Sequence, residues 1–132
     1  MANTFYPKGK TKILTAKIDF GADTIKAALV KNTYAYNAAH EFLTDLGTNV
    51  IDSQALDTKT VVDGVFDAAD VNFPTLAAGS TARAIVLYKD TGVAGTSALI
   101  GYLDDVPGLP AATSGGDIKI AWSNGADKVL AI

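Results

Sequence analysis

The chain has 132 residues, of which 48% are hydrophobic and 19% are charged. This composition predicts a single folded domain and excludes disorder over the whole length, because the chain has enough apolar surface to form a core. Cys is absent and His40 is the only His. Disulfides, thiolate metal sites, cysteine nucleophiles and paired-histidine sites are therefore excluded.

The charge pattern argues against nucleic-acid binding. The formal net charge is −3, whereas nucleic-acid-binding surfaces are usually basic. Arg83 is the only Arg, although planar phosphate recognition usually draws on Arg. Thirteen of the 14 acidic residues are Asp, which favours turns over helices. No apolar run suits a signal peptide or a membrane span, so we expect no membrane as partner. The charge pattern leads us to expect no nucleic acid as partner either.

The N-terminal part of the sequence predicts an arm followed by a hairpin. Residues 1–12 are polar and lack periodicity, so we expect a free arm outside a single β-sandwich domain of residues 13–132. Residues 13–20 alternate between apolar and polar side chains and predict a half-buried strand. A turn at 21–23 would pair this strand with a second one at 24–30.

The rest of the chain predicts one short helix and then strands. Residues 38–46 have helical spacing, and Gly47 would end the helix. The predicted later elements are an edge strand at 54–62, strands at 71–73, 81–88 and 97–103, a long loop at 104–116, and a final hairpin of 117–123 with 128–132 around Asn124-Gly125.

Many short strands without crossover helices predict an all-β fold, mainly antiparallel, of the β-sandwich or jelly-roll type. In the last predicted hairpin, Ile118, Ile120 and Trp122 share one face of a strand. We therefore expect Trp122 to lie in the core.

The residues that suggest catalysis or metal binding have simpler structural explanations. His40 would be the general base, but no nucleophile lies near it in the sequence, so we assign it no role. Ser97 lacks the second glycine of a nucleophile elbow, and residues 92–97 lack the Lys of a phosphate loop. The Asp-rich turns at 57–70 and 104–105 lack EF-hand spacing. We expect no enzyme activity and no cofactor; whether those turns bind Ca²⁺ stays open.

Four aromatic residues in irregular segments are the candidate protein-interface residues: Phe5, Tyr6, Tyr34 and Tyr36. A tyrosine at such a position supplies a large contact with a polar tip, which suits a protein interface. The alternative is that these rings cover the open ends of the sandwich. The sequence leaves both explanations open.

Six stretches of sequence, in this order and spacing, carry a resemblance to a known family. They read DTIKAALV (23–30), HEFLTDL (40–46), AIVLYKDTG (84–92), TSALIGYLD (96–104), GLP (108–110) and GGDIKIAWSNGADKV (115–129). Together they span residues 23–129. They are similar to a family of small structural proteins of tailed-bacteriophage virions.

The resemblance implies a non-enzymatic virion protein, made in the host cytoplasm, and above all a decoration (cement) protein on the capsid surface. Its partner would be the major capsid protein or another virion protein, and the class implies a homo-oligomer, with a trimer favoured. Phe5 and Tyr6 of the arm would then lie on the lattice.

Two other functions stay open. One is a phage tail or fibre component. The other is a carbohydrate-binding β-sandwich module, although the only Trp, Trp122, lies on a face predicted to be buried.

Overall fold

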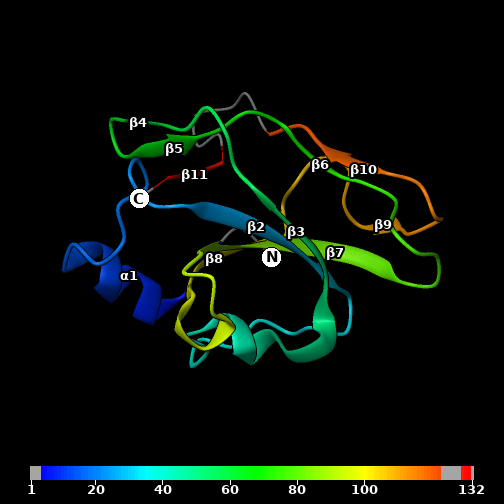
Figure 1. Cartoon of the computed structure of the whole chain (residues 1–132), viewed down its shortest axis with the longest axis horizontal. Coiled ribbons are helices and arrows are strands. Elements are labelled where there is room, and N and C mark those ends of the chain that lie inside the picture. Colours follow the sequence, from blue (N-terminus) through cyan, green and yellow to red (C-terminus); the bar gives the residue numbers. More distant parts are fainter. Residues whose placement is uncertain (1–3, 123–128, 132) are drawn as a thin grey trace.

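Three antiparallel sheets make up most of the fold in the computed structural model, which describes residues 4–122 and 129–131 (Figure 1). The prediction of an all-β, mainly antiparallel fold with a short helix is confirmed. The large sheet has the order β1-β8-β7-β2-β3, and β9 pairs with β7. Its strands are β1 (Thr4–Phe5), β2 (Ile25–Lys31), β3 (Val50–Ala55), β7 (Thr81–Lys89), β8 (Ala98–Leu103) and β9 (Ala111–Ala112).

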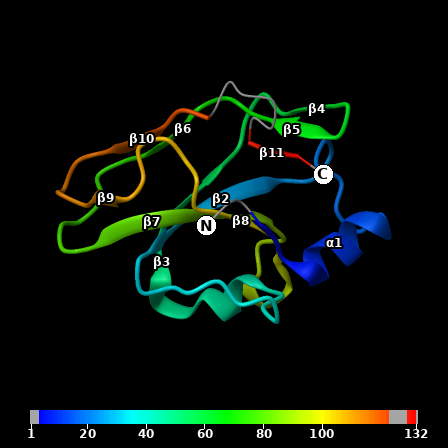
Figure 2. The same cartoon turned by 180° about the vertical axis from the view of Figure 1, so that it is seen from behind.

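Two small sheets lie on one side of the large sheet, and the helical segments lie on the other side (Figures 1 and 2). The first small sheet pairs β6 (Val71–Phe73) with β10 (Ile118–Ile120). The second has the order β11-β5-β4 and consists of β4 (Thr60–Val62), β5 (Val65–Asp67) and β11 (Leu130–Ala131). The helical segments are α1 (Pro7–Leu14) and two 3-10 helices, η1 (Leu43–Asn49) and η2 (Ala94–Thr96).

The large sheet is buried on both faces. Leu29 and Leu87 belong to a core that includes residues of the two small sheets. Val30 and Val86, which point to the opposite face, belong to a second core with Tyr6 and residues of η1. Because successive side chains of a strand point to opposite faces, burial on both sides favours apolar residues at consecutive positions. This preference explains the continuous apolar runs at 27–30 of β2, 84–88 of β7 and 98–103 of β8.

The strand predicted at residues 13–20 is wrong. Helix α1 ends at Leu14, and residues 15–24 form turns that lead into β2. Pro7 takes one of the first positions of α1, where its missing N–H costs no helical hydrogen bond. Leu14, which the alternation placed in the core, is 85% exposed. The strand predicted at 24–30 is confirmed as β2, but its partners are β3 and β7.

The helix predicted at 38–46 is displaced and of a different type. The 3-10 segment η1 begins at Leu43 and consists of two short helical turns that meet at Gly47. The positive φ of 59° at Gly47 interrupts the helical backbone there, as expected of this glycine. The segment before η1 pairs with the start of β8: the N–H of Leu43 donates to the Ser97 carbonyl, and the N–H of Leu99 donates to the Glu41 carbonyl, both at 2.9 Å. These bonds use backbone groups that an α-helix over 38–46 would need.

The second half of the chain follows the predictions more closely. Strands β6, β7 and β8 are confirmed. The edge strand predicted at 54–62 divides near Thr58, whose φ is 52°, into β3 and β4, which are edges of different sheets. Two-residue strand β9 interrupts the predicted loop at 104–116.

The prediction of a final hairpin between 117–123 and 128–132 is wrong, because β10 pairs with β6 and β11 pairs with β5. The predicted turn at Asn124-Gly125 lies outside the described residues. Trp122 is buried, as expected, and Ile120 and the partly buried Ile118 belong to the same core.

Candidate functional site

The structure brings the four predicted interface residues together. The hydroxyl of Tyr6 lies 2.7 Å from the hydroxyl of Tyr34, and the rings of Tyr6 and Tyr36 are 5.0 Å apart. The hydroxyl of Tyr36 donates to the Phe5 carbonyl at 3.0 Å. Tyr6 and Tyr34 are buried, so they present no ring to a partner, whereas Phe5 and Tyr36 are half-buried. Both rings pack in the second core, on the face of the large sheet that η1 covers, and not at an open end of a sandwich.

A chain of hydrogen bonds continues from these tyrosines to the only histidine. The hydroxyl of Tyr34 lies 2.8 Å from Nδ1 of His40 as well as beside the hydroxyl of Tyr6. Burial, together with the bond to Tyr34, raises the pKa of Tyr6 far above its ordinary value, so its hydroxyl stays protonated. Burial also raises the pKa of Tyr34. The chain therefore joins the N-terminal segment to the loop before η1 through neutral hydroxyls.

The described part of the predicted arm is not free. Thr4 and Phe5 pair with β8, and the N–H of Tyr6 donates to the Ile100 carbonyl at 3.0 Å. On α1, the ammonium group of Lys12 lies 2.6 Å from the carboxylate of Glu41. The prediction of an arm that separates from the domain is therefore wrong for residues 4–12, which form an integral edge of the large sheet and a helix packed beside it.

The residues weighed for catalysis have structural partners. Ser97 is fully buried, where its hydroxyl donates to the Val93 carbonyl at 2.9 Å and accepts from the N–H of Thr91 at 3.1 Å. Within residues 4–122 and 129–131, no group of three or more His, Asp or Glu side chains is arranged to hold a metal ion.

No helix in that part of the chain is both long and apolar enough to cross a membrane.

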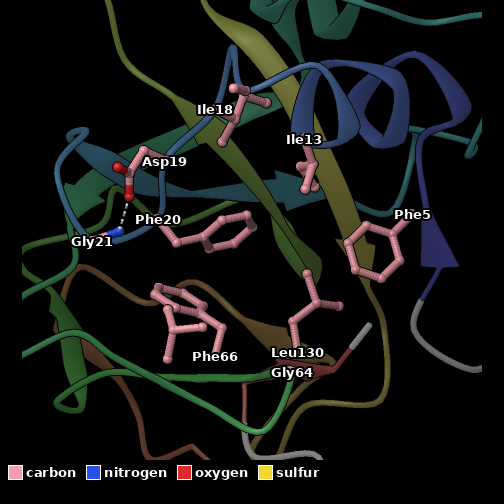
Figure 3. Close-up of a pocket in the computed structure, with 11 residues that line it drawn as sticks. Phe5, Ile13, Ile18, Asp19, Phe20, Gly21, Gly64, Phe66 and Leu130 are labelled. Atoms are coloured by element: carbon pink, nitrogen blue, oxygen red, sulfur yellow. Dashed lines mark hydrogen bonds between the residues drawn. The ribbon is translucent and has the colours of Figure 1, made fainter.

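The most distinctive surface feature is an apolar cleft between the α1–β2 connection and the β4–β5 hairpin (Figure 3). Its volume is about 680 Å³. The rings of Phe20 and Phe66 meet edge to face inside it, with centroids 4.8 Å apart. The apolar side chains larger than Ala that line it are Phe5, Ile13, Ile18, Phe20, Val61, Phe66 and Leu130.

The cleft has little polar chemistry. Asp19 is the one ionisable residue among the described residues of its lining. The Asp19 carboxylate accepts hydrogen bonds from the N–H groups of Gly21 and Ala22, at 2.9 and 3.2 Å. This carboxylate therefore holds the loop in place. What the cleft offers a binding partner is mainly hydrophobic contact.

Two exposed apolar residues belong to or directly follow the lining of the cleft. Val61 of β4 lines it and is 54% exposed, and Leu14, the residue after Ile13 of the lining, is 85% exposed. Val62 is 64% exposed, but it pairs with Val65 and therefore points to the other face of the hairpin from Val61 and Phe66. Sequence reasoning missed this surface. Its parts come from three separate segments, and the alternation at 13–20 assigned Leu14 to the core. The one usable signal was the pair Val61-Val62 in an otherwise polar segment.

The chain matches no protein-family model, no curated protein and no solved structure.

Proposed function

We propose that this protein is a non-enzymatic structural protein of a phage virion, a capsid decoration protein that binds the head lattice. The observation that carries the proposal is the apolar cleft, with exposed Val61 in its lining and exposed Leu14 directly after Ile13 of that lining. Exposed apolar side chains that gather at one place are typical of protein-binding surfaces, because hydrophobic burial drives protein association. The sequence resemblance to small virion proteins supports a capsid protein as the partner.

The docking surface in this proposal differs from the one expected from the sequence. Phe5 contributes to the lining of the cleft, whereas Tyr6 and Tyr34 form the support behind β8. The N-terminal segment therefore acts through its position on the sheet, where it forms one wall of the cleft. Binding then needs no ordering of a free arm, and its entropic cost is correspondingly lower.

Binding of a Leu14 variant to particles tests the proposal. Particles of the phage that lack this protein are mixed with the pure protein and sedimented together. Leu14→Lys places a charge directly after Ile13 of the cleft lining, and it suits the C-terminal end of α1 because a cation there favours the helix dipole. We expect binding at least tenfold weaker than that of the native protein.

The matched control is Val93→Lys, which changes an exposed apolar residue on a different loop and should bind normally. Equal binding by both variants would exclude the cleft as the docking surface. Antibody labelling of intact particles then separates head from tail: label on the tail would replace decoration with the tail or fibre alternative, and label on neither would overturn the virion proposal.

The burial of Trp122 bears on the carbohydrate alternative. Its indole N–H donates to the Ala69 carbonyl at 3.0 Å, and the ring belongs to the core between the sheets. This ring is therefore not available as a platform on which a sugar could stack.

A further inference from the structure

An exposed strand edge lies beside the cleft. Strand β4 is the last strand of its sheet, and in the part of the chain that the structure describes no strand pairs with its outer edge. In Figures 1 and 2, β4 is drawn at the margin of the molecule, with β5 and β11 between it and the large sheet. All three residues of β4 are exposed, and none is charged. Such an edge can pair with a strand of another chain.

The turn that closes the β4–β5 hairpin shows which backbone groups point outward. Asp63 and Gly64 have φ values of 52° and 77°, as a two-residue type I′ turn requires, and Val62 pairs with Val65 beside it. Residues that flank such a turn exchange backbone hydrogen bonds, and the next pair along does not. The N–H and C=O groups of Val61 therefore point away from β5, toward the outer edge.

The residues around β4 are complementary to a second copy of themselves. The sequence from 59 to 63 is Lys-Thr-Val-Val-Asp. If two such strands pair antiparallel about a twofold axis at Val61, Lys59, which precedes β4, lies near Asp63 of the other copy, the first residue of the turn after β4. Opposite charges brought together at both ends of the strand pair attract each other. Each Val61 would also exchange two backbone hydrogen bonds with its symmetry mate.

From these observations we infer that β4 is a self-association edge, where two copies of this chain join their β11-β5-β4 sheets into one continuous sheet. The twofold axis runs perpendicular to that sheet, because paired antiparallel strands are related in this way. Both apolar clefts then lie on the same face of the joined sheet, next to each other. Val61, which lines each cleft, meets its mate at the centre.

The absence of Cys makes the contact directly testable in the full-length protein. Val61→Cys introduces one thiol at the proposed axis. Cα atoms of directly paired strand residues are about 5.5 Å apart, a separation that a disulfide spans. Val93→Cys is the matched control, because Val93 is 60% exposed, similar to Val61, but lies before η2. Under mild oxidation at about 100 μM protein, we expect Val61→Cys to give covalent dimer at least tenfold faster than the control.

A charge-exchange series tests the register. Lys59→Glu and Asp63→Lys each place like charges across the pair, so each single variant should weaken the dimer about tenfold in sedimentation equilibrium. The double variant restores opposite charges and should restore dimerisation. Lys59 also donates to the Asp23 carbonyl within its own chain. The double variant does not restore that bond, so recovery would report the contact between copies.

A strand pair of this size is a small contact, so we expect a dissociation constant between about 10 μM and 1 mM. Equal oxidation rates for Val61→Cys and Val93→Cys would overturn the inference. So would a native protein that sediments as a monomer up to about 1 mM, or as the trimer that the family resemblance implies. These outcomes are independent of particle binding, so they leave the proposed function separately testable.

Discussion

The hydroxyl groups of Tyr6 and Tyr34 lie 2.7 Å apart, although the two residues are 28 positions apart in the sequence. Tyr6 is wholly buried at the end of β1, and Tyr34 lies in the loop between β2 and η1. Neutral hydroxyls can satisfy each other inside a core, where an unpaired hydroxyl would be costly. This bond fastens the N-terminal segment to the sheet, and it explains why residues that looked like an exposed arm belong to the domain.

Removing the N-terminal segment should therefore destabilise the protein. Deletion of residues 2–12 removes β1, Tyr6 and most of α1. Tyr6→Ala alone should cost about 3–5 kcal/mol, because it empties a buried site of ring size. We expect the deletion to cost at least as much, measured by thermal and urea unfolding. Leu14→Ala, at an exposed position, should change stability by less than about 0.5 kcal/mol. If the deletion variant has the same melting temperature as the native protein, the segment is a separate arm.

Gly9 is required by the close approach of α1 to β8. A Cβ atom on Gly9 would lie 2.4 Å from the Leu99 carbonyl oxygen and 3.1 Å from the Ile100 Cα, so the helix would have to shift. Gly9→Ala should therefore destabilise the fold by about 1–3 kcal/mol in urea unfolding. Gly95→Ala is the control, since a Cβ there meets nothing within 4 Å, and it should be neutral or slightly stabilising. Equal urea midpoints for Gly9→Ala and Gly95→Ala would contradict the close approach of α1 to β8.

Trp122 connects β10 to the loop before β6. Its backbone N–H donates to the Asp70 carboxylate at 3.1 Å, and its indole N–H donates to the Ala69 carbonyl at 3.0 Å. Trp122→Ala should cost about 3–5 kcal/mol, and Trp122→Phe should cost less because the core stays filled. Urea unfolding followed by circular dichroism measures the free energy of unfolding of both variants. Losses below 1 kcal/mol for Trp122→Ala would place the ring outside the core.

The stability of η1 should depend on pH through Asp45. Its carboxylate accepts hydrogen bonds from the N–H groups of Glu41 and Phe42, at 2.8 and 3.0 Å, and these bonds lower its pKa below the ordinary value of 3.8. Because the folded pKa is depressed, the stabilisation is complete above the unfolded pKa and is lost as the pH falls through the folded one.

At pH 7, Asp45→Ala should therefore have a lower free energy of unfolding than the native protein. This difference in free energy should become smaller below about pH 4. Asp45→Asn keeps an acceptor but does not titrate, so its stability relative to Asp45→Ala should stay nearly constant. Urea unfolding between pH 2 and 7 gives the comparison. If the native protein and Asp45→Ala differ in free energy of unfolding by the same amount at pH 2 as at pH 7, the hydrogen bonds to the carboxylate do not stabilise the fold.

The sequence alone determined the all-β class and most of the central strands. Strands β7 and β8 could be predicted because a strand buried on both faces carries a continuous apolar run. Strand β2 could be predicted because Ile25, Ala27 and Leu29 share one face. The burial of Trp122 was also legible, from the alternation around β10. These signals are local, since each depends on the side chains of one short segment.

The tertiary structure decided the features that depend on contacts between distant segments. Residues 7–14 contain Pro and Gly and show no helical pattern, yet they form α1 because Gly9 lets a helix touch the backbone of β8. Likewise, the tyrosine cluster needs β8 to bring Tyr6 to Tyr34. The cleft needs three segments to meet, and the open edge of β4 exists only because β5 occupies the other edge. No local pattern encodes such pairings, because their free energy comes from surfaces that only the folded chain brings together.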